Sequence, residues 1–424
     1  MMTNNSFARG ALAVATLTLL AACQSTPPAA TLAAGAVVAP VAPVASVAPA
    51  APAWQQGRLP AQAGSTLAPL AGKLTVTPAA EIPVQNLRLP AGFKAEIWAT
   101  GMPGARAMAR AENGKIYIGT RAIGRVYELT DTGTARTSRV LVDKLVQPSG
   151  VAYANGALYV MAIDKVLRFD GIATNPGAQP VDMTAAFKLP KEQHHNWKYI
   201  AFGPDGKLYV PFGAPCNICE PGQEYAQIRR YNADGSGMEV IARGVRNTVG
   251  FDWHPESKEL WFTDHGRDWM GDDGPADELN RISKTGLNFG FPYCHADGIV
   301  DRDFPKAGAC DGVTLPVQTM GPHSAVMGAH FYTGSMFPPE YKNALFVARK
   351  GSWNRTQKFG YDVVIVRTDA QGNNPRIQPF MTGFLDPIND SFSGRPTYML
   401  QLPDGSLLVS DEQMGAIYRI TYAR

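Results

Sequence analysis

The sequence is poor in cysteine and nearly balanced in charge. Only five of its 424 residues are cysteine, and its formal net charge is +3. Nucleic-acid-binding domains carry a strong basic excess, so this balance gives no support for a nucleic-acid partner. Beyond residue 22, no apolar run reaches the length of a membrane-spanning helix.

Several cofactor and catalytic motifs are also missing. No GxGxxG follows a strand and opens a helix, so a nicotinamide-binding Rossmann unit is not supported. The chain has neither a P-loop nor a GxSxG nucleophile elbow. It also lacks CxxCH, the attachment motif of c-type haem.

The N-terminal residues are typical of a bacterial lipoprotein signal peptide, which we expect over residues 1–22. Arg9 is followed by an apolar run, and Leu20-Ala21-Ala22-Cys23 has the form of a lipobox. We therefore expect cleavage before Cys23 and its lipidation, with the protein periplasmic and anchored to the bacterial membrane. The alternative is an ordinary secretory signal with an incidental cysteine.

Residues 23–80 are rich in Ala, Pro and Val. This composition predicts a disordered tether with little stable structure. The folded domain is expected over residues 81–424.

Four cysteines remain when Cys23 is set aside, and an even number in an exported chain indicates two disulfides. We favour the local pairing, Cys216–Cys219 and Cys294–Cys310, although the sequence does not determine it. A metal site at residues 216–219 would need further soft ligands, and there is no second CxxC. A redox-active CxxC would lack its usual βαβ context.

A short unit recurs from about residue 87 onward. Each copy has a turn and then an apolar run, at residues 115–118, 157–160, 207–210, 259–262, 344–347 and 406–409. Asn-Gly or Asp-Gly precedes four of these runs, and both pairs favour tight hairpins. Six copies of three or four strands predict an all-β, six-bladed β-propeller, closed by pairing residues 417–422 with the first strand. A pair of β-sandwiches is the alternative.

The stretch from Gly244 to Asn280 combines a donor pair, Arg246-Asn247, with a strand and an oxygen-rich segment. We expect that segment to be a loop carrying the carboxylates of Asp268, Asp272, Asp273, Asp277 and Glu278. Such a setting suits an anionic cofactor beside a hard cation, since Ca²⁺ takes carboxylate and carbonyl oxygens. A Gly/Asp-rich surface turn is the alternative.

Three other segments carry residues suited to a site. His194-His195 offers a general base near neutral pH, or is simply an exposed pair. The segment from Arg349 to Arg355 places cations beside Trp353, which suits a planar polyanion, or is a solvated basic loop. Arg395 lies before the last hairpin and could bring another cation to the same funnel.

Together these stretches resemble the glucose/sorbosone dehydrogenase family, most closely its sorbosone dehydrogenase-like branch. The resemblance covers residues 87–422 and is carried by HHNWKYIAFGPDGKLYV, APCNICEPG, GVRNTVGFDWHP, ELWFTDHGRD, DELN, NFGFPYC, FPPEYKNALFVARKGSWNR and GRPTYMLQLPDGSLLVSDE. It implies a six-bladed quinoprotein that uses pyrroloquinoline quinone (PQQ) and Ca²⁺.

The resemblance also implies roles for individual residues. His195 matches the catalytic base, with His194 as the competing choice, and Arg246-Asn247 matches the pair beside the quinone. Lys350 and Arg395 match residues that contact PQQ. The main-chain carbonyls of Gly266 and Arg267 match Ca²⁺ ligands, and Asp277-Glu278 falls at a second calcium site of some members.

The chain departs from the family's soluble glucose dehydrogenases at three positions. Thr397 replaces a second arginine, which removes one cation from around PQQ unless Arg349 or Arg355 substitutes. Thr248 and Arg267 stand where those enzymes have proline.

The predicted function is PQQ- and Ca²⁺-dependent oxidation of an aldose to its lactone, or of a sorbosone-like aldehyde to its acid. Electrons would pass to a separate acceptor, a quinone or a cytochrome. The alternatives are a propeller that binds a ligand or partner without turnover, and a Ca²⁺-dependent lactonase with a carboxylate-rich funnel.

Overall fold

The computed structural model describes residues 51–423. Residues 1–50, which include the expected signal peptide and Cys23, lie outside this part, as does Arg424. Within it, no helix is long and apolar enough to cross a membrane.

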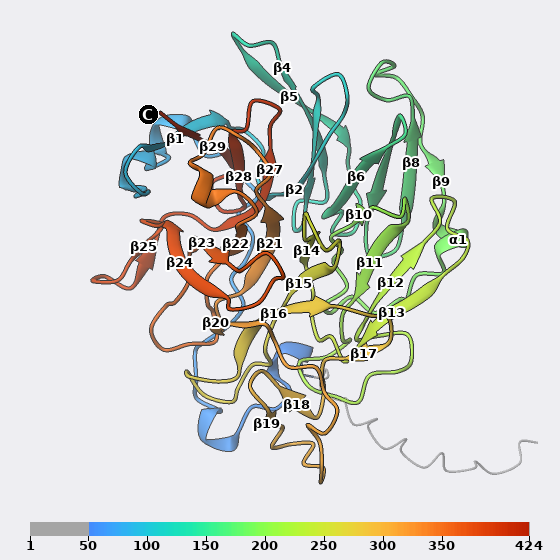
Figure 1. Ribbon diagram of the computed structural model, residues 1–424, viewed down its shortest axis with the longest axis vertical. Coiled ribbons are helices and arrows are strands. Elements are labelled where there is room, and N and C mark those ends of the chain that lie inside the picture. Colours follow the sequence, from blue (N-terminus) through green and yellow to red (C-terminus); the bar gives the residue numbers. More distant parts are fainter. Residues whose placement is uncertain (1–50, 424) are drawn as a thin grey trace, which may run out of the picture. The chain divides into compact units, whose positions relative to one another are not determined.

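Six sheets form the blades of a β-propeller (Figure 1). The first blade contains β2 (Ala105–Arg110), β3 (Ile116–Thr120), β4 (Val126–Asp131) and β5 (Arg136–Val142). The second contains β6 (Gly150–Ala154), β7 (Ala157–Met161), β8 (Val166–Asp170) and β9 (Val181–Asp182). The third contains β10 (Ala201–Phe202), β11 (Leu208–Phe212), β12 (Gln227–Tyr231) and β13 (Glu239–Arg243), and β17 (Leu287–Asn288) extends it. The fourth blade contains β14 (Gly250–Trp253), β15 (Leu260–Asp264), β16 (Ala276–Ile282) and β20 (Gln318–Pro322). The fifth contains β21 (Val326–Phe331), β22 (Leu345–Arg349), β23 (Asp362–Arg367) and β24 (Arg376–Met381). The sixth contains β27 (Pro396–Gln401), β28 (Leu407–Asp411), β29 (Ala416–Tyr422) and β1 (Phe93–Ala99).

The remaining elements are short and lie in the connections. They are the hairpins β18 (Cys294–His295) with β19 (Ile299–Val300) and β25 (Leu385–Asp386) with β26 (Ser391–Phe392), the helix α1 (Thr184–Phe187), and the 3₁₀ turns η1 (Ala53–Gln55), η2 (Pro60–Gln62), η3 (Ala79–Glu81), η4 (Val84–Asn86) and η5 (Pro339–Tyr341).

The two ends of the domain close the ring, as predicted. β1 pairs antiparallel with β29, with Phe93 opposite Tyr422. The hairpin signals are confirmed as well. Asn155 and Gly156 both have positive φ, 51° and 77°, in the two-residue turn between β6 and β7. This is the geometry that asparagine and glycine tolerate best.

Apolar side chains from neighbouring blades fill the space between them. Tyr209 and Phe251 lie in one such cluster, and Trp261 and Phe331 lie in the next. The middle strands are therefore buried on both faces, and every residue of β11 and β22 except Arg349 is buried. This packing holds the connecting loops in place.

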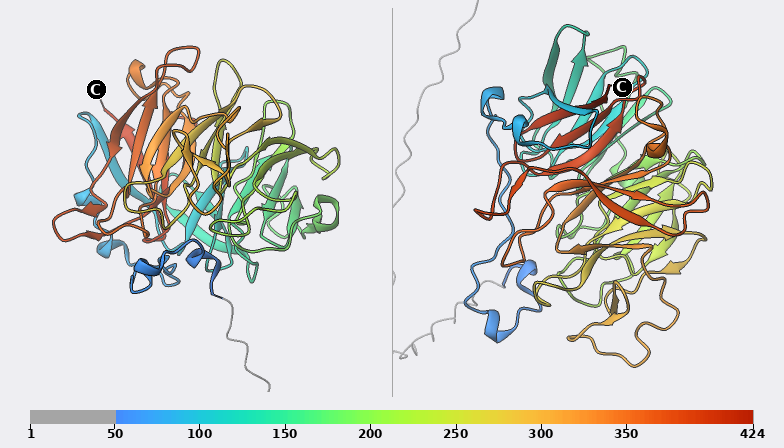
Figure 2. Two further views of the ribbon diagram at one scale, coloured as in Figure 1. Left: turned by 90° about the horizontal axis from the view of Figure 1, so that it is seen from below. Right: turned by 60° about the vertical axis from the view of Figure 1, so that its left-hand side comes forward.

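Two expectations about local structure were wrong. Asp277 and Glu278 lie in β16, where Glu278 pairs with Asp264, because this segment supplies the third strand of its blade. Residues 51–80 of the expected tether make specific contacts with the propeller, through Trp54 and Gln56 among others. Figure 2 shows this segment against one face of the ring.

Candidate functional site

A cavity of about 280 Å³ lies where the inter-strand loops of different blades converge. It brings together six of the residues predicted from the sequence: His195, Arg246, Asn247, Gly266, Lys350 and Arg395. They come from the connections before β10, before β14, after β15, after β22 and before β27. Residues separated by two hundred positions in the chain thus share one site, as a propeller funnel requires.

The histidine pair forms one wall of the cavity. The ring centroids of His194 and His195 are 3.9 Å apart, and His195 is only 7% exposed. Burial lowers the pKa of His194 to about 4 and that of His195 well below its ordinary value. Both rings are therefore neutral at pH 7. Within residues 51–423, Nδ1 of His195 has no hydrogen-bond partner.

The backbone holds His195 in an uncommon conformation. Its φ is 51°, in the left-handed region that non-glycine residues rarely occupy. A Cβ on Gly213 would lie 2.3 Å from the His195 carbonyl oxygen, so glycine is needed for this close approach. Strained residues of this kind cluster at functional sites.

Asp264, at the end of β15, positions the Arg246-Asn247 pair. Its carboxylate accepts hydrogen bonds from the main-chain N–H groups of Arg246 (2.8 Å) and Asn247. Nε2 of His265 donates its hydrogen to the Val326 carbonyl, so Nδ1 of the same ring is an acceptor. The Asn247 side-chain N–H donates to this Nδ1 at 2.9 Å. The amide of Asn247 is thereby oriented toward the cavity wall.

The Arg246 guanidinium is held by acceptors of the protein. Nη1 donates to the Gly266 carbonyl (2.9 Å) and Nη2 lies 3.3 Å from the Asp268 carboxylate. Nε and Nη2 also donate to the main-chain and side-chain oxygens of Asn217, at 2.9 and 2.7 Å. Arg246 is 3% exposed, so it contributes a fixed charge rather than a mobile donor.

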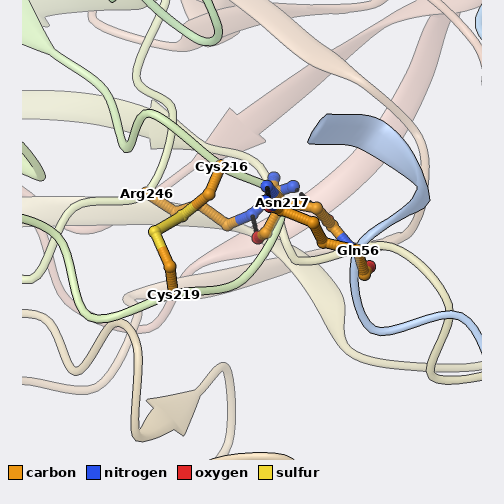
Figure 3. The surroundings of a disulfide bond; sticks show 5 residues. All are labelled: Gln56, Cys216, Asn217, Cys219 and Arg246. Atoms are coloured by element: carbon orange, nitrogen blue, oxygen red, sulfur yellow. Dashed lines mark hydrogen bonds between the residues drawn. A yellow bond between two sulfur atoms is a disulfide. The ribbon is translucent and has the colours of Figure 1, made fainter. Parts of the chain in front are cut away.

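Asn217 lies inside a small disulfide loop. Cys216–Cys219 and Cys294–Cys310 are both formed, which confirms the predicted pairing. Figure 3 shows the first of these bonds beside Asn217, Arg246 and Gln56. The loop therefore fixes the residue that holds Arg246.

Part of the cavity wall is cationic. Lys350, Arg395 and Arg121 line it, and the Arg121 guanidinium lies 4.1 Å from the ring centroid of Trp197. Behind them Glu412 pairs with Arg106 at 2.6 Å and lies 3.9 Å from Lys350 Nζ. Burial alone would raise the pKa of Glu412, but the charges of Arg106 and Lys350 lower it well below its usual range. In the described part of the chain, Nε of Arg395 is buried without a partner.

Neither Arg349 nor Arg355 takes the place of the second arginine. Arg349 pairs with Asp362 at 2.6 Å, and Arg355 lies 3.3 Å from Asp273. Thr397 is fully buried and its hydroxyl lies 3.0 Å from that of Ser410. Arg121 is a further cation that lines the cavity, and it could not be predicted because it stands alone after β3 without a motif.

Two predicted metal residues, Arg267 and Glu278, have side chains that are not among those lining the cavity, and the predicted calcium contact of the Arg267 main-chain carbonyl stays a prediction. The Arg267 side chain is fully buried and pairs with Asp301 and Asp303, both at 2.8 Å. The Glu278 carboxylate accepts a hydrogen bond from the main-chain N–H of Ala296 at 2.7 Å. Among the described residues, no group of three or more His, Cys, Asp or Glu side chains is arranged to hold a metal ion.

Known proteins are similar to this chain in sequence and in architecture. The sequence model of the glucose/sorbosone dehydrogenase family matches residues 181–352. An uncharacterized protein of Borreliella burgdorferi is 32% identical over 363 residues, which cover 82% of this chain and 94% of the relative. The chain belongs to the glucose/sorbosone dehydrogenase family. The match includes His195, Arg246, Gly266 and Lys350.

Solved structures of similar fold extend over most of the glucose/sorbosone dehydrogenase domain. A calcium structure of a Trichoderma reesei enzyme of carbohydrate-active family AA12 has a TM-score of 0.67 and 18% identity, covering 80% of this chain and 97% of its own. The holo form of the pyranose dehydrogenase PQQ domain from Coprinopsis cinerea has a TM-score of 0.66 and 17% identity, covering 79% and 97%. At this identity the likeness establishes the six-bladed fold.

Besides Arg121, the site of this glucose/sorbosone dehydrogenase family member contains residues that the sequence analysis did not assign to it. These are Trp197, His265 and His323, while Asp268 and Trp353, which belong to segments already singled out in the sequence, line the cavity as well. The His323 ring lies 3.8 Å from the Asp268 carboxylate. Trp197 follows the histidine pair closely and His265 precedes Gly266, and that proximity in the sequence was the available signal.

Proposed function

We propose that the protein is a PQQ- and Ca²⁺-dependent sugar dehydrogenase. It oxidises an aldose to its lactone, or a sorbosone-like sugar aldehyde to its acid, and delivers the electrons to a separate quinone or cytochrome. The observation that carries this proposal is the meeting of a neutral, buried histidine pair with a cationic wall in one cavity of a glucose/sorbosone dehydrogenase family member.

The cationic wall fits a polyanionic cofactor. Buried cations without enough counter-charge are costly unless a ligand supplies the missing anions. Arg121, Lys350 and Arg395 are close enough to act on one another electrostatically. Glu412 and Asp411 are nearby carboxylates, but Glu412 also pairs with Arg106. Nε of Arg395 lacks a partner within residues 51–423. The carboxylates of PQQ would complete this set of ion pairs, and the rings of Trp197 and Trp353 offer faces for its planar body.

Oxygen donors at the cavity fit Ca²⁺. They are the Gly266 carbonyl, which has a second lone pair besides the one that faces Arg246, and the carboxylates of Asp268 and Asp277. When bound, PQQ supplies a two-electron acceptor for hydride and Ca²⁺ supplies a Lewis acid.

The protein's own residues bind the sugar and move a proton. Oxidation of an aldose removes a proton from the C1 hydroxyl and a hydride from C1. His195 takes the proton, because burial keeps its ring neutral and Nδ1 has no partner in the described chain. Arg246 and Asn247 stabilise the negative charge that develops nearby, since both are held rigidly by Asp264.

Reconstitution tests the proposal directly. The protein is incubated with PQQ and Ca²⁺, and dye reduction is measured with a panel of aldoses and sorbosone, beside His195→Ala and His194→Ala. We expect turnover that requires both additions and falls by about 10²–10⁴-fold in His195→Ala. Failure of the protein to bind PQQ would overturn the proposal and favour a ligand- or partner-binding propeller. Lactone hydrolysis without PQQ would favour the lactonase.

We also propose that the mature protein is a periplasmic lipoprotein. The lipobox at Cys23 and the two disulfides support this location, because disulfides persist in oxidising compartments. Cells that express the wild type or Cys23→Ala are labelled with a radioactive fatty acid. We expect the wild type to be labelled and Cys23→Ala to be unlabelled, and equal labelling of the two proteins would contradict the proposal.

A further inference from the structure

Residues 51–72, here called the strap, lie across the cavity that holds the histidine pair and the cations. Trp54, Ala68, Pro69 and Leu70 of the strap line this cavity. The strap precedes the first blade and belongs to none of the six sheets. Its contacts nevertheless reach the loops of several blades.

The first half of the strap is held by residues of the site. Gln56 bonds twice to Asn217: its side-chain oxygen accepts from the Asn217 main-chain N–H (3.0 Å) and its carbonyl from the Asn217 amide (2.6 Å). The Gly57 carbonyl accepts from Arg302 at 2.6 Å. A Cβ on Gly57 would lie 2.0 Å from the Arg267 guanidinium, so a larger residue would not fit here.

Three tryptophans join the strap to two loops of the site. The Trp54 ring centroid lies 6.3 Å from that of Trp269 and 5.6 Å from that of Trp353. The indole N–H of Trp269 donates to the Trp54 carbonyl at 2.7 Å. Trp54 is therefore fixed in place and still contributes to the cavity wall.

The second half of the strap contacts the loop that carries Arg121 and also lines the cavity. A Cβ on Gly72 would lie 2.7 Å from Cβ of Ala122, the neighbour of Arg121. Ala68, Pro69 and Leu70 add apolar surface to a wall that is otherwise polar and charged. The strap thus spans the mouth from the Asn217 side to the Arg121 side.

We propose that the strap is the outer wall of the sugar site, and that Trp54 contacts the substrate and restricts the site to a single sugar ring. This inference rests on the proposed function, and it specifies that the sugar oxidised by the enzyme is a monosaccharide. Binding pockets commonly measure about 300–1,000 Å³ and combine aromatic faces with a few placed polar groups. The cavity here is about 280 Å³ with the strap in place, and bound PQQ would occupy part of that volume, which leaves less room for the sugar. A second sugar unit at the non-reacting end would meet Trp54 and Pro69.

The test compares glucose with maltose, two sugars that share a reducing glucose unit. In the full chain loaded with PQQ and Ca²⁺, we expect Trp54→Ala to lower the glucose-to-maltose ratio of kcat/KM by at least about tenfold. Trp54→Phe retains an aromatic wall and should keep most of the preference. Leu59→Ala changes an exposed residue of the strap that does not line the cavity, and it should match the wild type.

A second measurement does not depend on turnover. Hydrogen exchange of residues 51–72 is followed with and without saturating glucose, and glucose should slow exchange around Trp54 in the wild type. Turnover with an unchanged ratio in Trp54→Ala, or no protection of the strap, overturns the strap inference while the proposed function stands. No turnover of any sugar by the wild type overturns both.

Discussion

The side-chain oxygen of Asn217 lies 2.7 Å from Nη2 of Arg246, and its main-chain oxygen lies 2.9 Å from Nε of the same guanidinium. Asn217 is held in turn by the Cys216–Cys219 disulfide loop and by Gln56 of the strap. One residue therefore links the disulfide, the strap and the charge beside the histidine pair.

Asn217→Ala should lower kcat/KM for sugar oxidation by about 10–100-fold while the protein remains folded. The substitution removes one acceptor of Arg246 and loosens the strap, and small displacements of positioned groups have effects of this size. Steady-state kinetics with a melting curve would check it. Asn373→Ala, in an exposed loop, is the matched control. Equal kinetics for both variants would contradict the positioning role of Asn217.

Removing one cation of the wall should weaken PQQ binding. Arg121→Ala removes a half-buried cation and Lys350→Ala a buried one, and both line the cavity, so we expect the Kd for PQQ to rise by about 10–100-fold. Quenching of tryptophan fluorescence during a PQQ titration measures this Kd. Arg355→Ala removes a cation that pairs with Asp273 outside the cavity and should leave the Kd unchanged. Equal Kd values for all three variants would locate PQQ elsewhere.

Stability without cofactor should fall as the pH is lowered from 6.5 toward 4. Burial lowers the pKa of His265 to about 4. Between pH 6.5 and pH 4, His265 is therefore protonated in the unfolded chain and neutral in the folded protein. The contribution is complete above pH 6.5 and is lost as the pH falls toward 4. Glutamine does not titrate in this range. The drop in melting temperature between pH 7 and pH 4.5 should therefore be several degrees smaller for His265→Gln than for the wild type. Parallel curves would show that His265 titrates normally.

His323 acts in the opposite direction within the same site. Burial alone would lower its pKa, but the Asp268 carboxylate raises it above the ordinary value. Its contribution to stability is therefore present below pH 6.5 and is lost as the pH rises through the folded-state pKa. His265→Gln leaves this contribution in place, so the comparison with the wild type isolates His265.

Thr397→Arg should destabilise the protein rather than restore a PQQ contact. Thr397 is fully buried, and its hydroxyl lies 3.0 Å from that of Ser410 and 3.3 Å from the Ala105 carbonyl. A buried arginine here would cost on the order of 3 kcal/mol in unfolding free energy. Urea denaturation would measure the loss, with Thr137→Arg on an exposed strand as control. Unchanged stability together with tighter PQQ binding would show that position 397 can face the cavity.

The repeated strands could be predicted because their signal is local. Alternation and Asn-Gly turns are properties of short segments, and the runs at residues 157–160 and 207–210 became β7 and β11. The residues of the site could be proposed where they stand in recognisable motifs, as His195 and Arg246 do. Asp277 and Glu278 were misplaced because a charge-rich segment resembles a loop until its pairing with β15 is known.

The amino-acid sequence by itself determined the blade repeat, the family and a set of candidate site residues, whereas the disulfide pairing that it favoured was established only by the structure. Tertiary structure decided that Arg121 lines the cavity, that Arg349 pairs with Asp362, and that residues of the strap form part of the cavity wall. These features depend on contacts between segments far apart in the chain, such as Gln56 with Asn217. Such contacts arise only when the ring closes, because the packing of neighbouring blades sets where each loop lies.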